Sequence, residues 1–167
     1  MHEAIASGAL ETVSRERLWR ELFLAIDEAE APAILTQLRH AGALDALLGA
    51  SRRESELEKR LERSHHEVER DETIDRHVLF TGLLLAGAET DASQLNGAGF
   101  SQKRLRNVLQ IAHELPTIAR ELDEADSEAA RFRVFKAQSR EAIAAIAADR
   151  STIAGEIVRS RAFHAFT

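Results

Sequence analysis

The chain of 167 residues is long enough for one domain or two small subdomains, and its 44% hydrophobic and 30% charged residues indicate a packed core rather than disorder. Its 28 acidic and 22 basic residues give a net charge of -6, which argues against a general polyanion binder but allows local basic patches. Because there is no cysteine, disulfides, thiolate metal sites and cysteine nucleophiles are excluded.

The first fifty residues predict a series of short helices. The opening residues are expected to end a helix near Gly8. Ser14 can cap the next helix, which runs to about Asp27, because its hydroxyl can accept a free N–H of the first turn. Pro32 suits the first turn of a third helix, and Gly42 supplies its left-handed end. The apolar face of the Ser14 helix is expected to carry Leu18, Trp19, Leu22, Phe23 and Ile26.

The middle of the chain predicts one charged helix and one central apolar helix. Residues 51–54 have the spacing of a capping box, and the helix that they open carries a thin apolar seam of Leu57, Leu61 and Val68. Residues 73–86 are apolar on nearly all sides, so this helix should lie at the centre of the fold.

The last third predicts further capped helices. Ser101 can begin a helix that Pro116 is expected to interrupt, with a shorter helix following to about Leu122. Ser127 can cap the next helix, with Phe132 and Phe135 as core candidates. Two alanine-rich helices then complete the chain, with core candidates Ile143, Ile146, Ile153, Ile157 and Val158.

No segment has the period of a strand, so we predict an all-α fold, an elongated and irregular bundle of about eight to ten short helices. We divide it into a subdomain of residues 1–50 and a second subdomain of residues 51–167.

Several residues with possible chemistry are better explained as structural. Neither a His-Asp dipeptide nor a His-Glu-x-x-His pattern accompanies His65, His66, His77 and His113, so no metal ligands are predicted. The glycines at 97 and 99 precede a helix but follow no strand, which favours a loop over a phosphate cradle. No catalytic residues are predicted.

Basic side chains are the remaining functional signal. Lys103 and Arg106 are expected on one helix face with Gln110 and His113, and Arg104 lies between them in sequence. A second group follows the acidic turn at 123–126. Since arginine outnumbers lysine and its planar fork suits phosphate, the candidate RNA-binding residues are Lys103, Arg104, Arg106, Arg131, Arg133 and Lys136.

The order of motifs resembles a known family. Residues 13–22 contain Ser-x-Glu-Arg and then Glu-Leu, and an apolar helix at 34–38 and a Gly-Ala-Leu turn at 42–44 follow. This order is similar to the neck of bacterial tRNA nucleotidyltransferases and poly(A) polymerases. The helix at 79–85 and Phe100–Arg104 resemble the helical body of that family more loosely.

The resemblance implies a fold like the C-terminal region of class II CCA-adding enzymes, in which neck, body and tail embrace tRNA while a separate head adds nucleotides. It places Glu16, Arg17 and Glu21 where the neck braces the head. The head's glycine-rich element and Asp-x-Asp pair do not occur, so this chain is expected to hold no cofactor and to transfer no nucleotide unaided. The parent enzyme would use Mg and CTP or ATP in the head.

The leading hypothesis is therefore a tRNA-binding or structured-RNA-binding helical module that works with a catalytic head in the same or another chain. The alternative is a protein-interaction or oligomerisation module, with a second copy of the chain as a candidate partner. A helical hydrolase is a third hypothesis, for which the metal ligands are lacking. A fragment, a split-gene product and a repurposed paralogue remain open, as do CCA-adding and poly(A)-adding parents. Since no run of ~20 apolar residues and no signal-like start occurs, we expect a cytoplasmic protein with no membrane partner.

Overall fold

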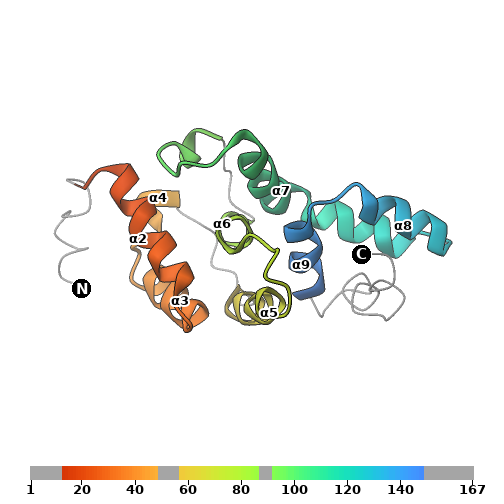
Figure 1. Ribbon diagram of the computed structural model, residues 1–167, viewed down its shortest axis with the longest axis horizontal. Coiled ribbons are helices and arrows are strands. Elements are labelled where there is room, and N and C mark those ends of the chain that lie inside the picture. Colours follow the sequence, from red (N-terminus) through yellow and green to blue (C-terminus); the bar gives the residue numbers. More distant parts are fainter. Residues whose placement is uncertain (1–12, 49–56, 87–91, 149–167) are drawn as a thin grey trace.

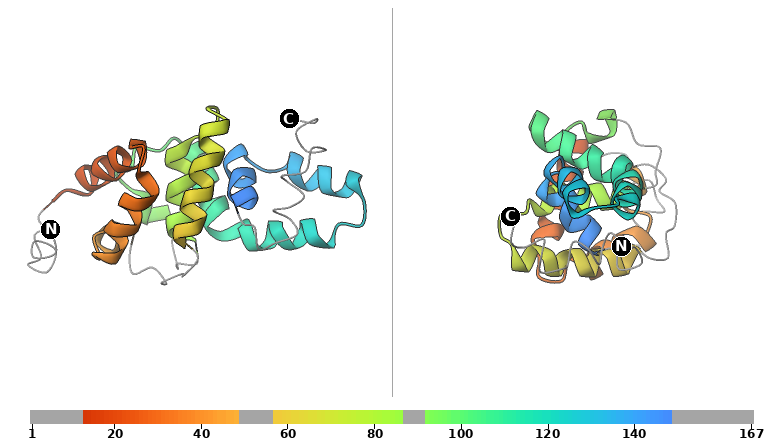
Figure 2. Two further views of the ribbon diagram at one scale, coloured as in Figure 1. Left: turned by 90° about the horizontal axis from the view of Figure 1, so that it is seen from below. Right: turned by 90° about the vertical axis from the view of Figure 1, so that its right-hand side faces the viewer.

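The computed structural model describes residues 13–48, 57–86 and 92–148, and within these ranges the chain is helical with no strand. The all-α prediction is confirmed. Figure 1 shows an elongated molecule with α2 to α4 at one end, α5, α6 and α9 in the middle and α8 at the other end, and Figure 2 shows the same order from two further sides. The elements are α2 (Arg15–Asp27), α3 (Ala31–His40), α4 (Asp45–Leu48), α5 (Leu57–Arg70), α6 (Arg76–Leu85), the 3-10 turn η2 (Ala92–Leu95), α7 (Gln102–Glu124), α8 (Glu128–Lys136) and α9 (Arg140–Ala148).

Helix α2 begins as predicted. The Ser14 hydroxyl accepts the N–H of Arg17 at 3.3 Å, and the helix ends at Asp27. Of its predicted apolar face, Trp19, Leu22 and Ile26 are buried, while Leu18 and Phe23 are half-buried. The helix therefore packs on the rest of the fold mainly through every third or fourth residue.

The neighbouring short helices also follow the predicted signals. Pro32 lies in the first turn of α3, where its missing N–H costs nothing. Gly42 has a φ of 72°, so it supplies the left-handed end of α3 that a side chain with a Cβ would adopt only with strain. Arg15 connects the elements at this end of the molecule, and the sequence analysis did not predict this role. The Arg15 guanidinium donates to the carbonyls of Leu47 and Gln94, at 2.7 and 2.5 Å, and so connects α2 with α4 and η2.

Helix α6 is the centre of the fold, as its sequence predicts. All eight residues from Val78 to Leu85 are buried, and α6 contacts α2, α5, α7 and α9. Gly82 lets α7 approach closely, because a Cβ built on it would lie 2.6 Å from the Cβ of Ile111. Asp75 caps the helix by accepting the N–H of Val78 at 3.2 Å. The apolar residues Leu57, Leu61 and Val68 of α5 are buried as expected, and the half-buried Arg63 donates to the carbonyl of Ala148 in α9 at 3.0 Å.

The prediction that Pro116 interrupts the helix is wrong. Helix α7 continues through Pro116 to Glu124 as one helix, so this part of the chain has fewer helices than expected. The φ of proline suits a helix, and its main cost is one lost hydrogen bond and crowding of the preceding turn. Buried side chains on both sides of Pro116 oppose that cost, with Ile111 in the main core and Ile118 and Leu122 in a second one.

This second core lies at the α8 end of the molecule. Phe135 of α8 packs there with Ile118 and Leu122 of α7 and Ile146 of α9. Ser127 caps α8 as predicted, accepting the N–H of Ala130 at 3.2 Å. Phe132 was also expected in the core, but its side chain is 43% exposed, so Phe135 alone of the two enters the second core.

Some predictions fall outside the described residues. These are the helix end near Gly8, the capping box at 51–54 and the core candidates Ile153, Ile157 and Val158. The division at residue 50 stays a prediction. The buried residues on its two sides, from Trp19 to Leu48 and from Leu57 onward, belong to the same main core. Within the described ranges no helix is long and apolar enough to cross a bilayer.

The close contact between α6 and α7 leads to the first prediction. Gly82→Ala should lower the free energy of unfolding by about 1–3 kcal/mol, because the new methyl group overlaps Ile111. Helix propensity alone would instead raise it by up to about 1 kcal/mol. Urea unfolding monitored by circular dichroism shows which of these two effects on the free energy of unfolding is larger. A double-mutant cycle with Ile111→Ala should show a favourable coupling, and a Gly82→Ala variant as stable as the wild type would contradict the close packing.

Candidate nucleic-acid interface

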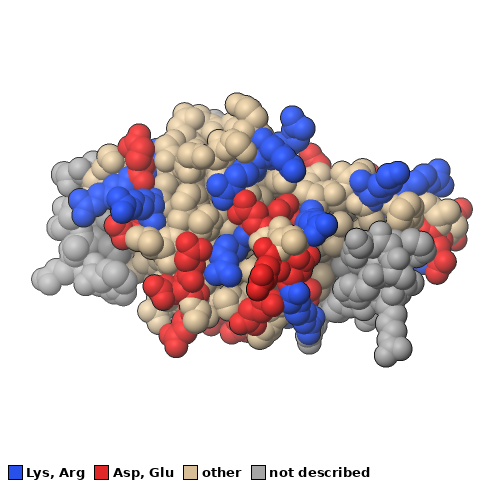
Figure 3. All heavy atoms as spheres, viewed as in Figure 1, with Lys and Arg blue, Asp and Glu red and all other residues tan. Residues whose placement is uncertain are grey.

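Two of the candidate basic residues are exposed near the start of α7. Ser101 caps this helix by accepting the N–H of Arg104 at 3.4 Å, and Lys103 and Arg106 follow on its exposed side. Figure 3 shows basic side chains along the upper edge of the molecule, over the start of α7 and again over α8. Phosphate groups are contacted by such exposed, multiply donating side chains.

The second exposed pair lies on α8. Arg133 and Lys136 are exposed and one turn apart, and the Arg133 Nε donates to the carbonyl of Ala129 in its own helix at 3.3 Å. Arg131 is half-buried and, at 3.6 residues per turn, lies roughly 160° around the helix from Arg133. The three residues that were grouped by sequence therefore do not share one face.

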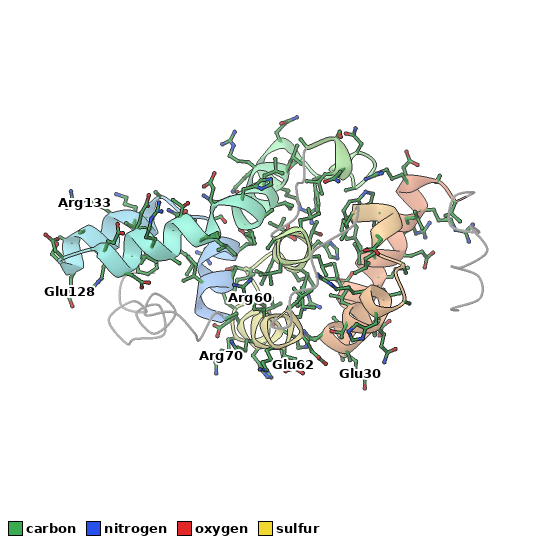
Figure 4. All side chains as sticks on the ribbon, turned by 180° about the vertical axis from the view of Figure 1, so that it is seen from behind. Glu30, Arg60, Glu62, Arg70, Glu128 and Arg133 are labelled. Carbon is green, nitrogen blue, oxygen red and sulfur yellow. The ribbon has the colours of Figure 1, made fainter. Side chains whose placement is uncertain are left out.

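Acidic side chains gather away from these basic faces. Exposed glutamates on α5 include Glu58, Glu62 and Glu69. In Figure 4 the labelled Glu30 and Glu62 lie along the lower edge of the molecule together with Arg70, and Glu128 and Arg133 lie on opposite sides of α8. The basic residues of α7 and α8 are thus exposed although the chain is acidic on average.

Arg104, the remaining candidate, is occupied within the protein. Its Nε lies 2.7 Å from Oδ2 of Asp75 and its Nη2 donates to Oδ1 at 3.0 Å, so the guanidinium and the carboxylate form a two-point ion pair. The guanidinium also lies 4.8 Å from the ring centroid of Phe100 and 3.4 Å from Nδ1 of His77. These contacts connect the starts of α6 and α7.

The same contacts continue as a polar network across four helices. His77 stacks on Phe23 at 4.5 Å, and its Nε2 lies 3.0 Å from Oδ1 of Asp27 at the end of α2. On the other side, the buried Glu141 of α9 accepts the backbone N–H of Asp75 at 3.2 Å and the side-chain amide of Asn107 at 3.1 Å. Because these hydrogen bonds are directional, they set how α2, α6, α7 and α9 meet.

The turn before α6 holds a carboxylate with a shifted pKa. Asp71 accepts the hydroxyl of Thr73 at 2.5 Å and its N–H at 2.9 Å. These two bonds, with a smaller contribution from the charge of Arg140, hold the pKa of Asp71 below its ordinary value. Any stability that this shift contributes is present above the unfolded pKa and is lost as the pH falls through the lower, folded pKa. Asp71 is therefore charged beside Arg140 at neutral pH.

The neck-like residues Glu16, Arg17 and Glu21 are all exposed on α2. Among the described residues no ion pair joins Arg17 to Glu21. Glu16 lies beside Gly97, at one end of a shallow groove of about 270 Å³ between α2 and the loop after η2. Leu24, 53% exposed, lies along this groove, which is lined by Glu16, Trp19, Arg20, Phe23, Leu24, Asp27, Gly97 and Ala98.

Three of the four candidate histidines contact carboxylates, and His113 is exposed. His65 and His66 lie 3.5 and 3.2 Å from the carboxylate of Glu69, and His77 belongs to the polar network. Within the described ranges no three His, Asp or Glu side chains form a group that could hold a metal ion. Gly97 and Gly99 have φ values of 85° and 70°, so they make the left-handed turns of a loop, as predicted.

Sequence reasoning missed one connection between the two basic faces. Gln110, expected on the exposed face with Lys103, is half-buried, and its Nε2 donates to Oε1 of Gln138 at 3.1 Å. Its Oε1 accepts the N–H of Ser139 at 3.3 Å. No local signal predicts this contact, because its partners lie 28 and 29 residues further along the chain.

Comparisons with known proteins identify the fold but not a family. No family model matches the chain, and no curated protein matches it. Two solved structures of tRNA-processing enzymes, one described as complex 3 and the other as apo form 2, superpose with a TM-score of 0.75 each, at 17% and 18% identity. Each match covers 94% of this chain but only 44% and 47% of the other chains. The chain therefore shares the fold of somewhat less than half of a tRNA-processing enzyme.

The different environments of two adjacent basic residues lead to the second prediction. Arg104→Ala should lower the free energy of unfolding by about 1–2 kcal/mol, because it leaves Asp75 without its half-exposed ion pair. Lys103→Ala, the matched control, removes an exposed charge and should change stability by less than about 0.5 kcal/mol. Thermal unfolding of both variants checks this, and equal effects would contradict a structural role for Arg104.

Proposed function

We propose that this chain is an RNA-binding helical module of a protein like the tRNA nucleotidyltransferases and poly(A) polymerases, and that it contacts the tRNA backbone while a separate head carries the chemistry. The observation that carries the proposal is the shared fold, which extends over 94% of this chain in two tRNA-processing enzymes. The resemblance of residues 13–22 to the neck motif supports the same family. We place this role of the protein in the cytoplasm.

The charge layout supports the mode of contact. Lys103 and Arg106 on α7 and Arg133 and Lys136 on α8 are exposed, so their donors are accessible to phosphate. Contacts of this kind position RNA without reading its sequence, and they release counterions. Arg104 and Arg131 are less accessible, so we assign them no direct contact. The proposed ligand is the acceptor and T-arm side of tRNA, held by its backbone.

Salt dependence gives the third prediction. The chain should bind a tRNA acceptor and T-arm minihelix at low salt, with an affinity that falls steeply as salt rises. Replacing Lys103, Arg106, Arg133 and Lys136 together by alanine should lower the slope of log K against log salt by about 3–4, at roughly 0.9 per lost phosphate contact. Fluorescence anisotropy at several salt concentrations measures both quantities.

A control and a negative outcome make this test specific. Arg70 is an exposed cation on α5, paired with Glu67 at 3.3 Å and remote from Arg133 in Figure 4. Arg70→Ala should therefore leave both the affinity and the slope nearly unchanged. No detectable minihelix binding by the wild type at low salt would remove the RNA-binding proposal.

A second candidate function is self-association through the groove on α2. Leu24 is 53% exposed beside the half-buried ring of Phe23, an arrangement that an apolar partner surface would cover. Trp19 lies beneath them and is only 1% exposed, so a change at Trp19 would test folding rather than contact. Leu24 is the residue that discriminates.

Self-association gives the fourth prediction. If the groove joins two copies, light scattering should detect a dimer that Leu24→Glu dissociates, because a buried carboxylate without a partner is costly. Ala33→Glu adds the same charge at an exposed position of α3 and should leave the dimer intact. A monomeric wild type at high concentration would exclude this candidate.

A further inference from the structure

We infer that Gln110 is a positioning residue, which fixes the basic face of α8 relative to that of α7 so that one RNA can contact both. The inference rests on the proposed function and adds a residue that carries no charge and touches no RNA. Its basis is the pair of hydrogen bonds from the Gln110 amide to the corner between α8 and α9.

The amide of Gln110 uses both of its functional atoms at this corner. Nε2 donates to Gln138, and Oε1 accepts the backbone N–H of Ser139. Gln138 is itself held to α8, because its Nε2 donates to the carbonyl of Val134 at 3.0 Å. Ser139 in turn accepts the N–H of Ala142 at the start of α9, at 3.1 Å. One side chain of α7 thus holds the end of α8 and the start of α9.

The position of Gln110 along α7 places this corner in line with the basic residues. Gln110 follows Lys103 by seven residues and Arg106 by four, so all three lie on nearly the same helix face. At 1.5 Å per residue, Gln110 is roughly 6 Å along the axis from Arg106. Lys136 lies two residues before Gln138. Figure 1 shows the segment between α8 and α9 returning to the middle of α7.

Apolar packing alone would not define this arrangement. The second core holds α8 through Phe135 against Ile118 and Leu122, which lie beyond Pro116 in α7. Hydrophobic contact is non-directional, so it allows α8 to tilt or turn. Hydrogen bonds to an amide require a defined distance and angle. The Gln110 contacts therefore supply the orientation, and they connect α8 to the part of α7 that carries Lys103 and Arg106.

Two charged faces in a fixed relation bind one polyanion better than two that move independently. The second face then meets its phosphates as an intramolecular step, without losing further orientational freedom. If the corner is released, α7 keeps its contacts but those of α8 become intermittent. Removing the Gln110 amide should thus weaken RNA binding although no charge is lost.

The test uses Gln110→Met, which removes both hydrogen bonds and nearly keeps the side-chain volume. Gln102→Met is the matched control, since Gln102 is an exposed glutamine in the first turn of the same helix. For Gln110→Met we expect about tenfold weaker minihelix binding and a salt slope lower by up to about 2, as for the loss of two phosphate contacts. Gln102→Met should match the wild type.

A double-mutant cycle separates positioning from general damage. In a variant that already carries Arg133→Ala and Lys136→Ala, Gln110→Met should have little further effect, because the face that it positions is gone. If Gln110→Met only unfolded part of the sample, the salt slope would stay unchanged and the two losses would add. Either result would overturn the inference, as would wild-type affinity in Gln110→Met.

A measurement without RNA tests the geometry independently of the proposed function. Since the chain has no cysteine, the double variant Gln102→Cys, Glu128→Cys carries spin labels at these two positions and nowhere else. The distance distribution between them should broaden or shift when Gln110→Met is added. An unchanged distribution would overturn the inference even if the protein binds RNA. An altered distribution without RNA binding by the wild type would instead remove the proposed function and the RNA role of Gln110 with it.

Discussion

The burial of α6 is the constraint on which the rest of the structure depends. Eight consecutive residues of this helix are buried, so it must be covered on every side, and α2, α5, α7 and α9 provide that cover. Burying one large apolar side chain contributes about 1.5–3 kcal/mol, which makes this helix the main source of stability in the middle of the molecule. Gly82 brings α7 close enough to complete the packing.

Polar contacts at the start of α6 determine how the covering helices are oriented. Asp75 caps α6, pairs with Arg104 of α7 and donates its backbone N–H to Glu141 of α9. His77 continues these contacts to Asp27 at the end of α2. Apolar burial explains why the four helices meet, and this network explains the angles at which they do so.

Helix α7 connects the two cores and carries one of the two groups of exposed basic residues. Its first part packs on α6, and its last part packs on α8 and α9 beyond Pro116. The basic residues of α7 and α8 then face one edge, while the exposed acids of α5 lie away from it. A chain with a net charge of -6 can therefore offer a local surface that suits a polyanion. The chain shares its fold with a part of two tRNA-processing enzymes.

The sequence by itself determined the helical class, the caps at Ser14, Ser101 and Ser127 and the central place of α6, because these depend on residues within one or two turns of each other. It did not reveal that α7 passes through Pro116, that Arg104 is held by Asp75, or that Gln110 meets Gln138. Each of these depends on contacts between segments far apart in the chain, such as the 66 residues between Asp75 and Glu141. Only tertiary packing brings such partners within hydrogen-bonding distance, so only the tertiary structure decided which charged and polar side chains remain available to a ligand.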